Sequence, residues 1–150
     1  MKMSPLFVKA KSNMQPGVIT KDGFLGTDSR QLIDIIEADE KKIKSINLDI
    51  DILTDKMNYF LKEGQKGLGE PITIDKKWLV KVTESRGKLP CPFEDGIFGK
   101  INVEIENLSN KEKCNYSQLS IHLIKKHIFF QGKNTFFRLE PEVLKRLFEI

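Results

Sequence analysis

Apolar residues in the first half of the chain recur at the three- and four-residue spacing of amphipathic helices. One apolar stripe follows Asp28 and consists of Leu32, Ile35, Ile36, Ile43 and Ile46. After a break at residues 47–49, a second stripe consists of Ile50, Leu53, Met57, Phe60 and Leu61. Asp28 with Gln31 three residues later is typical of a capping box, and Gly64 suits a helix end. The pattern predicts an antiparallel helical hairpin over residues 28–66.

The first 27 residues lack such a stripe and contain turn signals instead. Pro16-Gly17 and Asp22-Gly23 are dipeptides that favour turns. We therefore expect residues 1–27 to form an irregular arm, with one short strand at residues 17–20.

After Pro71 the apolar positions alternate with polar ones, which is the period of a half-buried strand. Segments 72–74 and 78–83 are joined by a three-residue turn and predict a β-hairpin. Residues 101–106 show the strictest alternation. The expected strands are 72–74, 78–83, 101–106 and 113–116. Residues 87–92 contain Pro90 and Pro92, which disfavour helix at the preceding residues, so a loop is expected there. The region 71–116 is therefore predicted to be rich in β-structure.

The remaining region, residues 117–150, mixes helix, loop and a short strand. Ser117 is a good N-cap for a helix ending near His127, and Pro141 suits the first turn of a terminal helix. Residues 136–139 are expected to form a short strand. The predicted fold class is α+β, in a single domain of residues 1–150: the helical hairpin packs on a small, mainly antiparallel sheet, followed by two short C-terminal helices.

The composition of the 150 residues is typical of a soluble globular protein, with 39% apolar and 31% charged residues. No apolar run approaches the roughly 20 residues that span a bilayer, and the N-terminus does not resemble a signal peptide. We therefore expect a cytoplasmic protein with two free cysteines and no membrane partner. The frequent Lys, Ile and Asn residues suggest an AT-rich bacterial genome.

Positive charge is concentrated in one part of the chain. The net charge is +4, and segment 111–138 holds six cations against one carboxylate, Glu112. Phenylalanine pairs at 129–130 and 136–137 lie in the same segment, and cations interleaved with aromatic rings are typical of single-stranded nucleic acid binding. The favoured function is a non-enzymatic binding module for nucleic acid or a phosphorylated ligand, and it needs no cofactor. The candidate ligand-binding residues are His122, Lys125, Lys126, Lys133 and Arg138.

An alternative function rests on the residues that can ligate a metal or act as nucleophiles. Cys91 and Asp95 are separated by three residues, and His122 and His127 by four. Tetrahedral zinc accepts all of these ligand types, although the spacing departs from that of a zinc finger. The same residues are also compatible with a small Cys/His hydrolase, so enzymatic activity remains open at this stage.

The helical geometry of the last region separates the two histidines. Five residues correspond to about 140° around a helix, so His122 and His127 are not expected on one face. We expect His122 to lie on the exposed cationic face and His127 to be packed or to cap the helix. The loop at residues 132–135 lacks the upstream glycine of a phosphate-binding loop, but its backbone N–H groups could still hold an anion.

Overall fold

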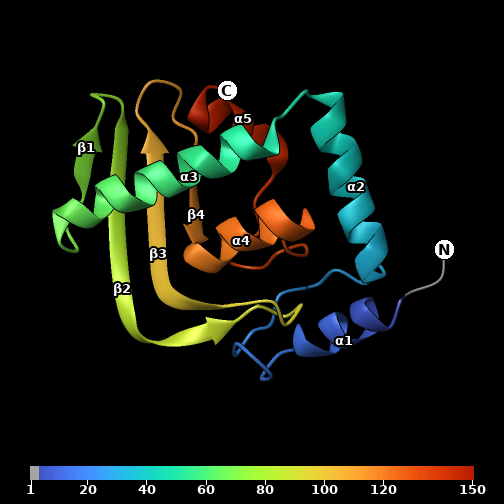
Figure 1. Ribbon diagram of the computed structural model, residues 1–150. Helices are drawn as coiled ribbons and strands as arrows, with labels where there is room; N and C mark the ends of the chain where they lie inside the picture. Colours follow the sequence, from blue (N-terminus) through green and yellow to red (C-terminus); the bar gives the residue numbers. More distant parts are fainter. Residues whose placement is uncertain (1–3) are drawn as a thin grey trace.

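The computed structural model describes residues 4–150 and has the predicted α+β class (Figure 1). Its elements are α1 (Pro5–Asn13), α2 (Leu32–Ser45), α3 (Ile50–Gly64), the 3-10 turn η1 (Gln65–Gly67), β1 (Ile72–Ile74), β2 (Trp78–Pro90), β3 (Ile97–Asn107), β4 (Lys113–Ser117), α4 (Gln118–His127) and α5 (Pro141–Phe148). Within the described residues, no helix is long and apolar enough to cross a bilayer.

The four strands form one antiparallel sheet in sequence order, β1-β2-β3-β4. Inward-facing residues pair across its centre, with Val82 opposite Val103 and Val103 opposite Tyr116. The register shifts between Ser85 and Lys88. In Figure 1 the far halves of β2 and β3 bend away from the flat part of the sheet toward α1. This bend carries the β2–β3 turn to the end of the molecule where α1 lies.

Helices α3, α4 and α5 pack against one face of the sheet, and their apolar side chains form the larger core cluster. Gly64 allows α3 to approach β2 closely, because a Cβ atom there would lie 2.5 Å from a methyl group of Val82. The buried Tyr116 hydroxyl donates to the backbone oxygen of Met57 at 2.8 Å. The apolar stripe of α3 is therefore covered as expected.

A second apolar cluster joins α1 and α2 to α4 and to the β2–β3 turn. It includes Ala10, Leu32, Cys91, Phe93 and Leu123, all buried. Helix α4 contributes to both clusters, through Leu119 and Leu123 on one side and Ile121 and Ile124 on the other. In Figure 1 α3 crosses the sheet, whereas α2 stands steeply to it at the side.

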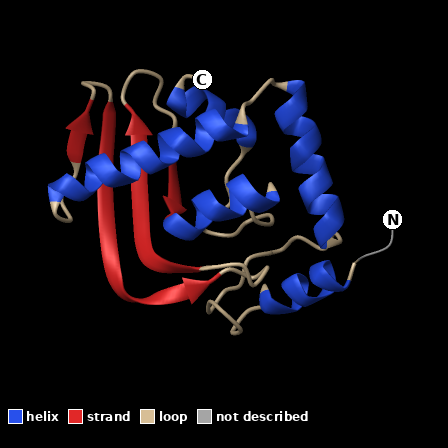
Figure 2. Cartoon of the chain, viewed as in Figure 1, coloured by secondary structure: helices blue, strands red, loops and turns tan. Residues whose placement is uncertain are grey.

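Local structure differs from the sequence-based prediction at both ends of the chain. Residues 5–13 form a helix instead of an irregular arm, because Ser4 accepts a hydrogen bond from Phe7 N and Pro5 starts the helix. The expected strands at residues 17–20 and 136–139 are absent; Figure 2 draws the connection between α4 and α5 as loop.

Two further boundaries were predicted wrongly. Helix α2 starts at Leu32, and Asp28 binds the backbone N–H and the guanidinium of Arg30 instead of capping it. Strand β2 continues through the expected loop to Pro90, because residues 88–90 pair with residues 97–99 of β3 beyond the register shift.

Candidate metal centre

The turn between β2 and β3 positions the first two residues of the candidate centre. Cys91 follows the last residue of β2, and its N–H donates to Gly96 O at 2.8 Å. Glu94 N donates back to Cys91 O at 2.8 Å, with Glu94 in the left-handed conformation at φ 64°. These bonds close a tight turn that places Asp95 on the same side as Cys91.

Helix α4 positions both histidines. It begins with a capping box in which the Ser117 and Ser120 side chains each accept a hydrogen bond from the other's backbone N–H. His122 lies in the middle of this helix and His127 is its last residue. Their Nε2 atoms each lie 2.8 Å from an oxygen of Asp95, His122 at Oδ1 and His127 at Oδ2.

Aromatic rings from the β2–β3 turn and from β3 pack against both imidazoles. The Phe93 ring stacks on His127 with the centroids 3.9 Å apart and an interplanar angle of 12°. Phe98 packs on His122 at 4.5 Å. The two imidazole centroids are 5.5 Å apart. Each imidazole is therefore held by a ring on one side and by Asp95 at Nε2.

The position of the turn is also fixed from α1. The side-chain amide of Asn13 donates to Pro92 O at 2.8 Å and to Glu94 at 3.4 Å. Asn13, Phe93 and Phe98 are further residues of this site that the sequence did not indicate. Their roles depend on contacts between segments far apart in the chain, and no local pattern of residues marks them.

The four side chains can all turn a ligand atom toward one point. The Cys91 sulfur, one carboxylate oxygen of Asp95 and one nitrogen of each histidine lie within 4.8 Å of one another. Ligands at normal zinc bond lengths are separated by about 3.3–3.8 Å along the edges of a tetrahedron. A shift of about 1 Å in the side chains therefore brings the four ligand atoms to the separations of a tetrahedral zinc site.

The cluster places one carboxylate, that of Asp95, beside a thiol and two imidazoles. Burial acts to raise the pKa of Asp95, but hydrogen bonds from the thiol and both imidazoles outweigh it and hold the pKa well below its ordinary value. Burial lowers the pKa of His127. Burial, reinforced by the Asp95 carboxylate, raises the pKa of Cys91 to about 12, so its thiol is protonated at neutral pH.

The expectation that the two histidines have separate environments is wrong. Both side chains are mostly buried, 13% and 18% exposed, and both point to Asp95. The angle around the helix describes where each side chain leaves the backbone, whereas helical side chains lean along the axis toward the N-terminus. Asp95 lies beside α4 within reach of both rings, so one carboxylate bridges residues five apart.

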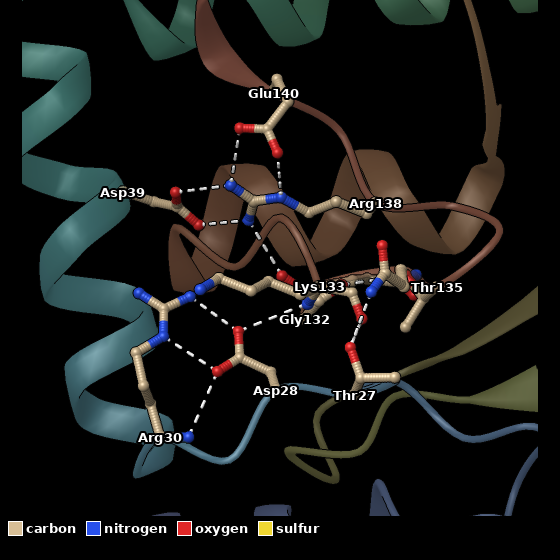
Figure 3. A network of polar contacts seen from close by, with 11 residues as sticks. Thr27, Asp28, Arg30, Asp39, Gly132, Lys133, Thr135, Arg138 and Glu140 are labelled. Carbon is tan, nitrogen blue, oxygen red and sulfur yellow. Dashed lines mark hydrogen bonds and ion pairs between the residues drawn. The ribbon is translucent and has the colours of Figure 1, made fainter.

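The residues predicted to bind an anion do not gather in one place. Lys125, Lys126 and Lys133 are exposed. His122 binds Asp95, as described above. Arg138 donates two hydrogen bonds to Asp39, at 2.6 and 2.9 Å, and others to Glu140 and to Gln131 O (Figure 3).

The loop of residues 132–135 uses its own backbone donors within the protein. Gly132 N donates to Phe24 O at 2.9 Å, and Lys133 N donates to the Asp28 carboxylate at 3.3 Å. Asp28 therefore occupies the position at which an external anion was expected, and Figure 3 shows it between Arg30 and Lys133.

Comparison of the chain with protein-family models, with curated proteins and with solved structures gave no match. The functional interpretation therefore rests on the geometry and chemistry of the cluster itself.

Proposed function

We propose that this protein binds one zinc ion through Cys91, Asp95, His122 and His127, and that the metal joins the β2–β3 turn to α4. The observation that carries the proposal is the convergence of four ligand atoms, one sulfur, one oxygen and two nitrogens, within 4.8 Å. Thiolate and imidazole ligands together favour zinc among the common biological metals.

The charge of the cluster supports a cation at this position. Among residues 4–150 no lysine or arginine forms an ion pair with Asp95, which instead accepts from the thiol and the two imidazoles. Zinc binding releases the thiol proton, because the thiolate is the ligand. A divalent ion with one thiolate, one carboxylate and two neutral imidazoles is electrically neutral, which suits a site where the thiol is buried and both imidazoles are mostly buried.

Four protein ligands favour a structural role for the metal over a catalytic one, since catalytic zinc keeps a position open for water or substrate. The alternative of a nucleophilic Cys91 needs a thiolate that a substrate can reach. Cys91 is 1% exposed and its thiol is protonated at neutral pH. The geometry therefore supports metal binding better than a Cys/His hydrolase.

The test is metal analysis of purified protein, expressed with zinc in the medium and without an affinity tag that binds metal. We expect one zinc per chain. Substitution of any ligand, as Cys91→Ser, Asp95→Asn, His122→Gln or His127→Gln, should reduce zinc retention after mild chelation. Cys114→Ser is the matched control for the thiol and Asp55→Asn for the carboxylate, since neither belongs to the cluster.

Two further readouts separate specific binding from surface binding. Cobalt-loaded protein should show a thiolate-to-metal charge-transfer band that Cys91→Ser abolishes and Cys114→Ser retains. Zinc at a hundredfold excess over its Kd should also add about 2.7 kcal/mol to the free energy of unfolding. Absence of stoichiometric zinc in the native protein, together with no cobalt band, would refute the proposal.

A further inference from the structure

A cavity of ≈ 570 Å³ lies apart from the metal centre, between residues 20–26, the bend of β2 and β3, and the loop at residues 131–137. Its volume is within the range of about 300–1,000 Å³ typical of small-molecule sites. Its lining combines phenylalanine rings, side-chain amides and two lysines, and no residue of the metal cluster contributes to it.

Gln131 is the most informative residue of this lining. The residue is 6% exposed, and its side-chain amide takes part in none of the hydrogen bonds among residues 4–150. No fully buried side-chain nitrogen or oxygen among these residues lacks a partner, so the unpaired amide atoms are those that reach solvent. Since Gln131 lines the cavity, its amide offers a donor and an acceptor to a molecule bound there. Its backbone is also in the left-handed conformation, at φ 71°, which is unfavourable for a glutamine.

The surrounding contacts hold the loop in this conformation. Gln131 O accepts from Arg138 at 2.9 Å, and Thr27 N donates to Lys133 O at 2.9 Å, in the network of Figure 3. The approach is close: a Cβ atom at Gly26 would lie 2.1 Å from Lys133 O. The backbone of the loop that carries Gln131 is therefore fixed before any ligand binds, which favours affinity.

An aromatic surface is also present at the cavity. Phe136 lines it and is 74% exposed, and it packs edge-on against Phe137 at 4.9 Å. An exposed phenylalanine beside a cavity provides a face on which a planar ring can stack.

The charges around the cavity favour an anionic group on the ligand. Lys21 and Lys100 line it against one carboxylate, Asp22. Neither lysine belongs to an ion pair among the described residues. Both are thus available to a phosphate.

We propose that this cavity binds a nucleotide. The base stacks on Phe136, its polar edge pairs with the Gln131 amide, and the phosphate lies toward Lys21 and Lys100. Glutamine recognises a nucleobase edge because its amide supplies one donor and one acceptor in a plane. The inference does not depend on the zinc site.

The experiment is isothermal titration calorimetry of the full chain with adenosine, guanosine, cytidine and uridine 5′-monophosphates at low salt. We expect at least one to bind with a millimolar or lower Kd. The nucleoside without phosphate should bind more weakly, and inorganic phosphate alone should bind more weakly still. Raising the salt concentration should reduce the difference between nucleotide and nucleoside.

The variants are chosen to preserve the fold. Phe136→Ala removes an exposed ring and should weaken binding about fivefold or more, by loss of stacking. Gln131→Met keeps the side-chain volume but removes the amide, and should weaken nucleotide binding by about fivefold or more. Lys100→Gln should abolish the preference for nucleotide over nucleoside, whereas the exposed Leu68→Ala should change nothing.

The proposal is overturned if none of the four nucleotides binds at millimolar concentration. It is also overturned if Phe136→Ala binds as tightly as the unsubstituted protein, a result that stays interpretable even where Gln131→Met fails to fold. Equal affinity for inorganic phosphate and nucleotide would show that no base is recognised and would overturn it as well.

Discussion

The ion pair between Asp39 and Arg138 allows a quantitative prediction about stability. Asp39 on α2 and Arg138 before α5 are joined by two hydrogen bonds of 2.6 and 2.9 Å, with side chains 9% and 13% exposed. Burial acts to lower the pKa of Arg138, but the hydrogen bonds that it donates to Asp39 and Glu140 raise it above its ordinary value. Arg138→Met removes the guanidinium while keeping an apolar side chain of similar length.

Arg138→Met leaves the Asp39 carboxylate buried without its partner. Breaking a buried pair in this way costs about 3–5 kcal/mol, a large part of a total stability of about 5–15 kcal/mol. For a chain of this size the loss corresponds to a fall in Tm of about 6–20 °C. The matched control is Arg146→Met, because Arg146 pairs with Glu112 but is 58% exposed. This exposed pair is worth about 0–1 kcal/mol.

The assay is urea denaturation of both variants, followed by circular dichroism, with calorimetry for Tm. Adding Asp39→Leu to Arg138→Met should restore most of the lost stability, since an apolar pair of similar volume is often neutral. Equal losses from Arg138→Met and Arg146→Met, or no recovery in the double variant, would refute the reasoning that the buried charge sets the cost.

Three further predictions follow from the charges and the two apolar clusters. A hydrogen bond from Arg30 lowers the pKa of Asp28 to about 2, so this carboxylate stabilises the fold above pH 3.8 and loses that effect as the pH falls toward 2. Asp28→Asn should therefore reduce the free energy of unfolding that is lost at acid pH by on the order of 1–2 kcal/mol, whereas Asp55→Asn should not. If nucleic acid binds the exposed cations of α4 and of the loop that follows it, fluorescence polarisation at low salt should detect the complex. Glutamine at Lys125, Lys126 and Lys133 should reduce the salt slope more than glutamine at Lys41, Lys42 and Lys44. Limited proteolysis should release no folded fragment of residues 1–70, because α4 contacts both apolar clusters.

Elements with a strong apolar period could be predicted from the sequence, because their own residues supply the buried face. Helices α3 and α4 and the inner half of β3 belong to this group. Helix α1 does not, since Ala10 is its one buried residue and the end of the helix is tied to the turn by Asn13. The outer half of β2 is also exposed and forms through backbone pairing with β3, which leaves no apolar alternation to detect.

The candidate centre could be predicted in its residues but not in its geometry. Cys91, Asp95, His122 and His127 are the residue types that zinc accepts, and their spacing alone argued against a shared site. The decisive fact is the bend at the register shift between Ser85 and Lys88, which precedes the turn carrying Cys91 and Asp95 beside α4. A bend that depends on pairing between two strands has no signature in a single segment.

Two carboxylates in this structure lead to opposite conclusions because their partners differ. Asp39 accepts hydrogen bonds from the guanidinium of Arg138, whose positive charge balances the carboxylate. The same guanidinium also donates to Glu140 and to Gln131 O, so Asp39 needs no external cation. The groups that donate to Asp95 are instead a protonated thiol and two imidazoles, and they bring no fixed positive charge. The thiol and both imidazoles become metal ligands when they give up or shift a proton, which a guanidinium does not do. The kind of donor around each carboxylate, and not the number of hydrogen bonds, is therefore what distinguishes an internal ion pair from a candidate metal centre.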